Sequence, residues 1–282
     1  MKKHSRHGLF FRAFFLSAFC LTCVFAFLLL AVAYDAPIGN LPDVSSAPIQ
    51  PEAGEETSLT LAVISRESEP PLFFSLDFAP ARTEAVVAFL PGRTLLYQNG
   101  SPTTLARLKE YGGAEYACRA AAAALGKGEG EYLVLREADL IEVIDRFGGV
   151  TAELPESVSI HRGGKTLYIG DGLRVLSGSE LTALLFHHSL LPGEYHRRQI
   201  TDLTVAALNS AAIPKNAELF RTALSEFLDR SQTGISATDY QKILRAAESY
   251  FSSHRPVAFP RYLSGEDTPE GNFSLSPNAL EQ

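Results

Sequence analysis

The most regular pattern of hydrophobic and polar positions lies between Glu131 and Val158. It opens with a short run of β-forming residues, Tyr132 to Leu135, followed by acidic residues of the kind favoured at a helix N-terminus. Apolar residues then recur at helical spacing, and Gly148-Gly149 ends the helix because glycine adopts the left-handed conformation of a C-cap. A second strand, Val150 to Leu154, follows directly. This strand–helix–strand unit predicts a layered α/β fold.

Apolar runs on either side of this unit extend the predicted domain over residues 59–254. They predict strands at 59–64, 72–76 and 85–90, and a hairpin turn at 77–82 that joins the last two strands. Helical spacing predicts helices at 105–111, 114–125, 181–187, 197–211, 217–228 and 238–251. Ser177 and Glu180 have the spacing of a capping box before the third of these. The tail 255–282 is rich in Pro, Gly and Ser and is expected to lie along the surface.

The N-terminal segment has the pattern of a membrane anchor. Residues 1–12 are basic, and the uncharged apolar run 13–34 would rise about 33 Å as a helix, enough to span a bilayer. The positive charges predict a cytoplasmic N-terminus and an extracytoplasmic domain in a single-pass protein of the cell membrane. The alternative is a signal peptide cleaved after Ala33, although the apolar run exceeds a typical signal core. Residues 35–58, rich in Pro and acidic residues, are expected to form a linker.

Charge and cysteine content narrow the possible functions. The formal net charge of the 282-residue chain is −7, and residues 1–34 carry four basic side chains and no acidic one, which leaves −11 on the remainder. Nucleic-acid binding requires a basic surface that neutralises phosphates, so we expect no nucleic-acid partner. Cys118 is the only cysteine outside the apolar N-terminal run, so no disulfide can form within the domain.

Five segments occur in an order that resembles the LytR-CpsA-Psr (LCP) family of cell-envelope enzymes. They read FFSLDFAPARTEAVVAFLPGRT, EYGGAEYACRAAAAALG, EYLVLREADLIEVIDRFGGVTAELPESV, DGLRVLSGSELTALLFHH and PGEYHRRQITDLTVAAL, and cover about residues 59–212. The resemblance implies an α/β fold, a three-layer α/β/α sandwich with a mixed central sheet and an apolar lipid pocket, preceded by one transmembrane helix. It implies Mg²⁺-dependent transfer of polymers from polyprenyl pyrophosphate carriers to peptidoglycan. The implied partners are the membrane and a polyprenyl-linked envelope polymer or peptidoglycan.

The family's metal-binding positions are only partly kept. A pyrophosphate site needs carboxylates that hold a metal ion and guanidinium groups that bind phosphate oxygens. The family's two aspartates fall at or near Ser65 and at Glu69, which makes Glu69 the candidate metal ligand. Arg66 lies near the family's first arginine. In Pro91-Gly92-Arg93 the arginine is displaced by one position, which in a strand can point the side chain to the opposite face.

The arginines of the two later helices are also reduced in number. Arg197 keeps the first arginine of the final helix. The alternative is that it lies at a solvated helix N-terminus, where an arginine needs no special explanation. The second arginine of that helix falls at Ile200, and the pair that follows the capping box falls at Phe186 and His188. A histidine could make a weaker, pH-dependent phosphate contact. The resemblance therefore implies Arg197 and Arg93 as catalytic candidates, and His188 and Arg66 as ligand-binding candidates.

Two hypotheses follow. One is a non-catalytic relative that keeps the scaffold and binds a polyprenyl-phosphate-type ligand, with little or no catalysis. The alternative is an active Mg²⁺-dependent phosphotransferase that attaches lipid-linked glycopolymers to peptidoglycan. Losing several charge-stabilising groups that act as a unit should lower the rate by orders of magnitude, which favours the first hypothesis.

Overall fold

The computed structural model describes residues 56–65, 69–98, 100–127, 131–212, 216–252, 257–277 and 279. All of them belong to one unit, Glu52–Gln282. The predicted basic tail 1–12, the predicted transmembrane segment 13–34 and most of the predicted linker lie outside the described residues. Within the described ranges, no helix combines the length and the apolar character needed to cross a membrane.

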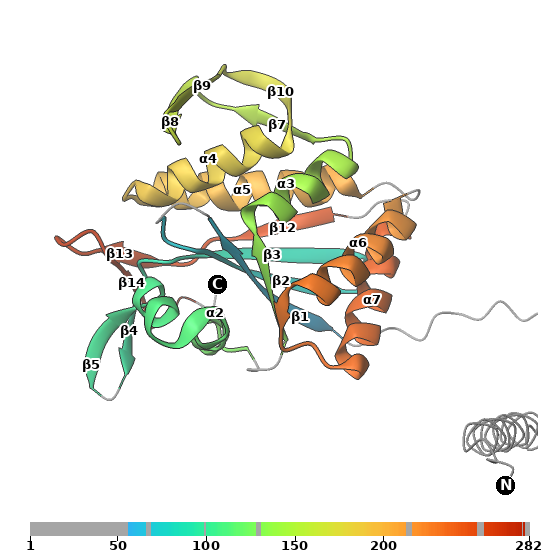
Figure 1. Ribbon diagram of the computed structural model, residues 1–282, viewed down its shortest axis with the longest axis horizontal. Coiled ribbons are helices and arrows are strands. Elements are labelled where there is room, and N and C mark those ends of the chain that lie inside the picture. Colours follow the sequence, from blue (N-terminus) through green and yellow to red (C-terminus); the bar gives the residue numbers. More distant parts are fainter. Residues whose placement is uncertain are drawn as a thin grey trace, which may run out of the picture. The chain divides into compact units, whose positions relative to one another are not determined.

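A six-stranded mixed sheet forms the centre of the unit (Figure 1). Its strands run in the order β11 (Gln232–Thr233), β6 (Tyr132–Arg136), β1 (Thr57–Ile64), β2 (Leu72–Ala79), β3 (Glu84–Pro91) and β12 (Val257–Arg261). The β1–β6 and β3–β12 pairs are parallel, and the others are antiparallel. Because of these directions, β1, β3 and β6 end at one edge of the sheet, where β2 begins. The expected mixed central sheet is confirmed.

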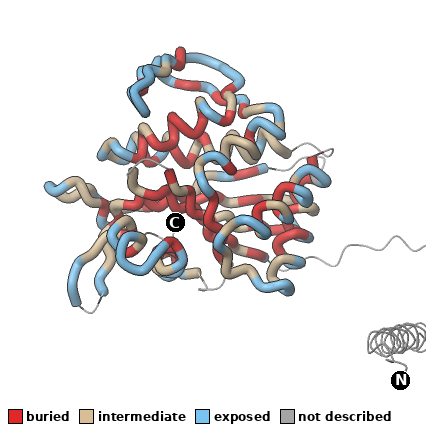
Figure 2. Tube along the Cα trace, viewed as in Figure 1, coloured by how far each residue is buried: buried red, intermediate tan, exposed pale blue. Residues whose placement is uncertain are grey.

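Helices cover both faces of this sheet. Successive residues of a strand point to opposite faces, and on β2 this sends Phe73 toward α2 (Leu105–Ala124) and Phe74 toward the opposite layer. That opposite layer contains α3 (Glu137–Arg146), α4 (Gly178–Leu190), α5 (Glu194–Ala211), α6 (Ala217–Arg230) and α7 (Ala237–Ser252). The sheet is buried along most of its length between these helices (Figure 2).

Four two-stranded sheets surround this centre. They are β4 (Leu95–Gln98) with β5 (Ser101–Thr104), β7 (Val150–Leu154) with β10 (Gly172–Leu176), β8 (Val158–Arg162) with β9 (Lys165–Ile169), and β13 (Gly265–Asp267) with β14 (Phe273–Leu275). The β8–β9 and β4–β5 hairpins are largely exposed (Figure 2). The last residue of β8, Arg162, contacts side chains that follow β1 and β6 at the end of the central sheet.

The predicted strand–helix–strand unit is present as β6, α3 and β7. Gly148 and Gly149 have φ of 90° and 86°, as expected for a glycine C-cap. A side chain on Gly149 would also collide with the Leu176 carbonyl oxygen, 2.7 Å from an ideal Cβ. The capping box at Ser177 and Glu180 is confirmed. However, β7 pairs with β10 and does not join the central sheet.

The C-terminal segment 255–282 differs most from its expectation. Instead of lying along the surface, Val257–Arg261 forms the edge strand β12, paired in parallel with β3. The following β13–β14 hairpin brings Asp267 to the end of the sheet and buries Phe273 completely. Pro, Gly and Ser indicate turns, but here they separate short strands whose partners are distant in the sequence.

Candidate functional site

The sheet edge where β1, β3 and β6 end gathers the candidate side chains. Ser65 follows β1, Glu137 follows β6 as the first residue of α3, and Arg93 follows β3. Glu69 lies just before β2, which begins at the same edge. Two separate clusters of charged side chains form there. Each contains arginine and carboxylate groups, and neither was predicted in full.

The first group, the Arg162 cluster, consists of Ser65, Glu69, Glu137 and Arg162. The guanidinium of Arg162 donates to Glu69 through Nε (2.9 Å, to Oε1) and through one terminal nitrogen. It donates to Glu137 through both terminal nitrogens, one of them 2.9 Å from Oε2, and to the Ser65 hydroxyl at 2.7 Å. Ser65 in turn donates to Glu137 at 3.1 Å. Arg162 therefore forms a two-pronged contact with each carboxylate.

Burial strengthens these contacts. The side chains of Arg162, Glu69 and Glu137 are only 16%, 13% and 17% exposed. The Arg162 guanidinium also lies 4.7 Å from the centre of the Phe186 ring. Burial alone would lower the pKa of Arg162, but the hydrogen bonds and charges of the two carboxylates outweigh it and raise that pKa. The guanidinium is therefore permanently charged in its position between the carboxylates.

This geometry bears directly on Glu69, the candidate metal ligand. Both of its carboxylate oxygens accept hydrogen bonds from Arg162. Among the described residues, no group of three or more His, Cys, Asp or Glu side chains is arranged to hold a metal ion. The Mg²⁺ that the resemblance implies would compete with a guanidinium for the same oxygens. The described residues of this cluster do not fit a bound Mg²⁺.

The second group, the Asp267 cluster, consists of Arg93, Arg197 and Asp267. Arg93 lies 2.9 Å from one oxygen of Asp267 as an ion pair, and it donates to the carbonyl oxygens of Gly271 (2.8 Å) and Leu191 (3.1 Å). These contacts tie the end of β3 to the β13–β14 hairpin and to the end of α4. The expected displacement of Arg93 therefore does not remove it from the site.

Arg197 reaches the same carboxylate from the first turns of α5. Its terminal nitrogen lies 2.7 Å from Asp267 Oδ2, an oxygen that also accepts from the Gly193 amide at 2.9 Å. Its guanidinium lies 4.1 Å from the centre of the Phe273 ring, within cation–π range. Arg197 is thus a buried side chain in a specific site, and the alternative of a solvated helix N-terminus is wrong for its position.

The Asp267 cluster has an excess of positive charge, because two guanidinium groups share one carboxylate. Burial, and then the charge of Arg197, lowers the pKa of Arg93, although Asp267 partly offsets this. Burial would raise the pKa of Asp267, but the two arginines and the Gly193 amide lower it. The buried Nε atoms of both arginines have no hydrogen-bond partner. Such a cluster attracts an anion.

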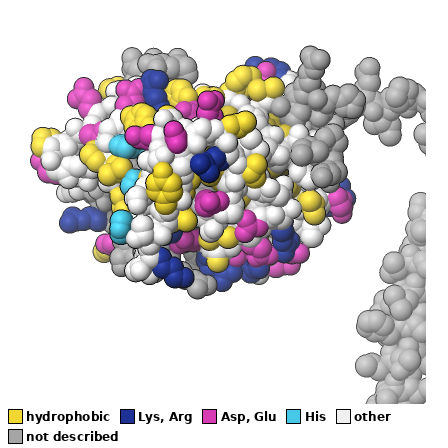
Figure 3. All heavy atoms as spheres, turned by 90° about the horizontal axis from the view of Figure 1, so that it is seen from above, with side chains coloured by type: hydrophobic (Ala, Val, Ile, Leu, Met, Phe, Trp, Pro, Cys, Tyr) yellow, Lys and Arg dark blue, Asp and Glu magenta, His cyan; other side chains and the backbone are white. Residues whose placement is uncertain are grey.

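Three histidines lie beside this cluster. The Nδ1 atoms of His188, on α4, and His196, on α5, are 3.0 Å apart, and the rings of His187 and His188 are in contact. Burial, followed by the charges of His196 and His187, lowers the pKa of His188 to about 4. Burial and the charges of His187 and Arg93 lower the pKa of His196, although the charge of Glu156 partly offsets this. Figure 3, viewed from the side of the β7–β10 strands and α4, shows histidine side chains along one margin of this face.

The structure thus brings Arg93 and Arg197 together, with the His188–His196 pair beside them, whereas Glu69 belongs to the other cluster. Arg66 lies outside the described residues. Sequence reasoning missed Arg162, Glu137 and Asp267. Arg162 was not singled out from the sequence, and Asp267 lay in the expected surface tail. A charge that becomes functional through contacts far along the chain leaves no local signal.

An apolar pocket of about 190 Å³ lies between the sheet and the helices of the five-helix layer. Twenty-five residues line it, including Leu59, Leu76, Ala207 and Phe251, and none carries a charge. Its one hydroxyl, on Thr204, already donates to the Ile200 carbonyl oxygen at 2.8 Å. The lining is therefore suited to hydrocarbon.

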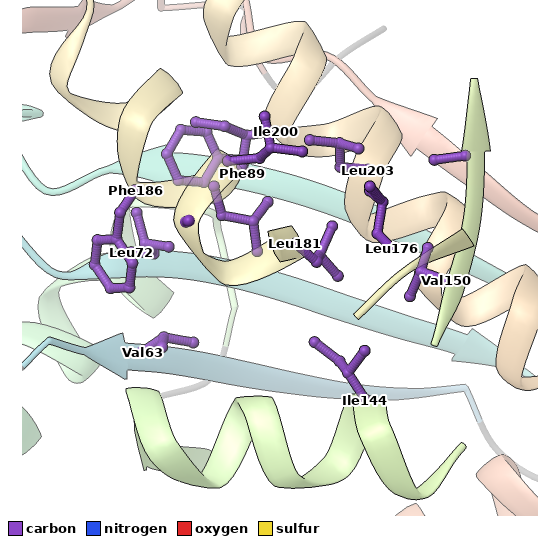
Figure 4. Close-up of a cluster of buried hydrophobic side chains, with 14 of the residues drawn as sticks. Val63, Leu72, Phe89, Ile144, Val150, Leu176, Leu181, Phe186, Ile200 and Leu203 are labelled. Carbon is purple, nitrogen blue, oxygen red and sulfur yellow. The ribbon is translucent and has the colours of Figure 1, made fainter. Parts of the chain in front are cut away.

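Phe186 and Ile200 are two of the positions at which the resemblance implies arginines. Both are completely buried in the hydrophobic cluster between α4, α5 and the sheet, and neither lines the pocket. Figure 4 shows them grouped with Leu72 and Phe89. At these positions the chain has hydrophobic packing and no charge.

The fold is similar to that of several solved structures. A protein of Eubacterium siraeum, described as a candidate transcription regulator, has a TM-score of 0.70 and 14% identity, over 86% of this chain and 95% of that chain. Bacillus subtilis TagV has a TM-score of 0.61 and 15% identity, over 81% of this chain and 94% of its own. TagT of the same organism, solved bound to LI-WTA, has a TM-score of 0.56 and 13% identity, over 80% of this chain and 87% of its own.

TagV and TagT are LytR-CpsA-Psr proteins, so the chain has an LCP-like fold. At these identities the similarity concerns the fold alone. The sequence itself matches no model of a known protein family and no curated protein.

Proposed function

We propose that this chain is an LCP-like protein of the cell envelope that binds a polyprenyl-phosphate-type ligand with little or no catalysis. The apolar pocket holds the isoprenoid chain, and the Asp267 cluster holds the phosphate end. The predicted segment 13–34 anchors the domain to the membrane, with the domain outside. The observation that carries the proposal is a charge-free pocket in a unit that also buries two arginines around a single carboxylate.

The pocket and the arginines are connected through α5. Arg197 precedes Thr204, which lines the pocket, by seven residues, or two turns and roughly 10 Å of helix. They therefore lie on the same face of α5. A lipid phosphate spans such a distance with its first isoprene units. The cavity is smaller than the roughly 300–1,000 Å³ of a drug-sized site, so it accommodates a segment of the chain and not a whole long carrier.

A phosphate would bind the arginines in competition with Asp267. Guanidinium groups bind phosphate oxygens in the same forked geometry as carboxylates. Asp267 now supplies that carboxylate to both arginines. A ligand phosphate with two negative charges would balance the two guanidinium groups fully, which a single carboxylate does not.

The same residues argue against efficient catalysis. Phosphoryl transfer depends on preorganised positive groups around the transferring phosphate. Phe186 and Ile200 are apolar where the family has arginines, and Glu69 is engaged by Arg162. The alternative function, Mg²⁺-dependent glycopolymer transfer to peptidoglycan, has one observation in its favour, the convergence of Arg93 and Arg197. TagT bound to LI-WTA supports a polymer-linked envelope ligand under either function.

Binding of farnesyl monophosphate to the full chain in detergent micelles tests the proposal. Ala207→Phe should fill the pocket and Arg197→Ala should remove one phosphate contact. Arg197→Ala should weaken binding roughly 10- to 100-fold, because a hydrogen bond to a charged group contributes about 1.5–3 kcal/mol. Ala207→Phe should weaken binding because its ring takes up the space of the isoprenoid chain. The matched controls are Ala123→Phe, on the exposed side of α2, and Arg198→Ala, the exposed neighbour of Arg197. Both should bind like the wild type.

Two results would overturn the proposal. Equal binding by wild type and Ala207→Phe would show that the pocket does not hold the isoprenoid. Mg²⁺-dependent hydrolysis or transfer of a polyprenyl pyrophosphate substrate, well above background and abolished by Arg197→Ala, would establish the alternative function.

A further inference from the structure

The Arg162 cluster has the oxygen ligands of a divalent-cation site. Ser65 and Glu137 follow two parallel strands that end side by side, with Ile64 opposite Arg136 in the register. Glu69 approaches from the segment that leads into β2. Together they direct four carboxylate oxygens and one hydroxyl toward a common centre. Mg²⁺, Mn²⁺ and Ca²⁺ prefer such ligands.

That centre is occupied by a cation from another part of the chain. Arg162 is the last residue of β8, which belongs to a separate two-stranded sheet, and it lies 93 positions from Glu69 in sequence. Its guanidinium reaches both carboxylates and the hydroxyl at once. Its contact with the Phe186 ring holds it from a further side. The arrangement resembles a metal centre in which a side chain takes the place of the ion.

A metal ion could enter only by displacing this side chain. Displacement would break at least the five hydrogen bonds described above and would separate a largely buried guanidinium from Glu69 and Glu137. An unpaired buried charge is strongly unfavourable, whereas a divalent ion in water keeps its full hydration. The side chain therefore has the advantage over the ion.

We infer that Arg162 is a built-in cation for Glu69 and Glu137, so that these two carboxylates have a positive partner without a divalent metal ion. Removing the guanidinium, with the carboxylates left in place, should then create a site for Mn²⁺ or Mg²⁺. The inference concerns the charge balance of the Arg162 cluster and does not depend on lipid binding. Its test uses variants that leave Arg197 and Ala207 unchanged.

The test is a Mn²⁺ titration of the full chain in detergent micelles, followed by the electron paramagnetic resonance signal of free Mn²⁺. The wild type should bind no Mn²⁺ at this site, and its unfolding temperature should be the same in Mn²⁺ and in chelator. Arg162→Gln should bind one Mn²⁺ per chain at Mn²⁺ concentrations at which the wild type binds none. Its unfolding temperature should rise in Mn²⁺ and in Mg²⁺.

Three further variants make the result specific. Adding Glu69→Gln to Arg162→Gln should remove the acquired Mn²⁺ binding. Arg162→Lys keeps a positive charge and should behave like the wild type. Arg136→Gln removes an arginine next to Glu137, one that pairs with Asp139 and not with the cluster, and should acquire no Mn²⁺ binding.

Either of two outcomes overturns the inference. One is a wild type that binds one Mn²⁺ in a manner abolished by Glu69→Gln. The other is a folded Arg162→Gln that acquires no Mn²⁺ affinity. If Arg162→Gln does not fold, the wild type and Arg162→Lys decide the question, because Mn²⁺ binding by either one that Glu69→Gln abolishes contradicts a built-in cation.

Discussion

Two arginine–carboxylate clusters lie at one edge of the central sheet with opposite charge balances. Among the described side chains of the Arg162 cluster, one guanidinium lies between two carboxylates, so the carboxylates are in excess. In the Asp267 cluster, one carboxylate serves two guanidinium groups, so a net positive charge remains. Arg162 makes a forked contact with Glu69 on one side and with Glu137 on the other. In the second cluster both arginines keep a buried Nε without a partner.

This difference shows how the same residue types have separate roles. A guanidinium enclosed by carboxylates serves as a fixed internal cation, because nothing further is needed to satisfy it. Two guanidinium groups that share one carboxylate still favour an additional or stronger anion. The clusters can therefore be tested separately by removing the minority charge of each.

Asp267→Ala should have the largest effect on the free energy of unfolding. It leaves Arg93 and Arg197 buried without a counter-ion, and breaking such a contact costs about 3–5 kcal/mol. Chemical denaturation measures the loss, and inorganic phosphate should restore more stability to this variant than to the wild type. Asp171→Ala removes an exposed carboxylate and should stay within about 0.5 kcal/mol of the wild type. A loss below about 1 kcal/mol for Asp267→Ala would mean that the two arginines do not depend on this carboxylate.

Arg162→Gln should destabilise the protein less, by roughly 2–4 kcal/mol in chelator, because carboxylates can take up protons when they lose a cation. Glu69 and Glu137 are then left facing each other without a cation between them, and like charges in one site repel. Denaturation curves in chelator measure the loss, and a loss below about 1 kcal/mol contradicts the charge assignment.

Much of the scaffold could be predicted from local pattern, and much of the site could not. The unit from Tyr132 to Leu154 specifies itself, because its strand, cap and glycines act on near neighbours in sequence. Arg93 and Arg197 were found through resemblance. Arg162 and Asp267 became important only through contacts 93 positions away with Glu69 and 70 positions away with Arg197. Such contacts depend on topology, which no local periodicity encodes.

The histidine pair gives a smaller test at the border of the positive cluster. Burial lowers the pKa of His188 to about 4 in the folded protein, against about 6.5 in an unfolded chain. Its contribution is therefore fully present above about pH 6.5 and is lost as pH falls toward 4, a change of about 1–3 kcal/mol. His188→Gln should flatten this dependence in denaturation curves, whereas His161→Gln, at an exposed position, should not. Identical pH profiles for wild type and His188→Gln would show that the pair is not buried in its neutral form.

Arg198→Ala should have the smallest effect. Arg198 pairs with Glu194 on the exposed side of α5 and lies 4.7 Å from the Tyr262 ring centre. Exposed pairs of this kind contribute about 0.3–0.5 kcal/mol. Thermal unfolding of Arg197→Ala and Arg198→Ala, side by side, should separate a buried site residue from its neighbour. Equal losses would contradict the burial of Arg197.

The position of Asp267 in the chain also affects the order of folding. Arg93 contacts Gly271 across 178 positions of sequence, and β3 gains its second neighbour only from β12. During synthesis from the N-terminus, the edge of β3 and both arginines must wait until this late segment has emerged. An unpaired strand edge is prone to wrong association in that interval. The late β12–β14 segment thus completes the central sheet and supplies the carboxylate that the two arginines share, so we expect its formation to limit the yield of folded protein.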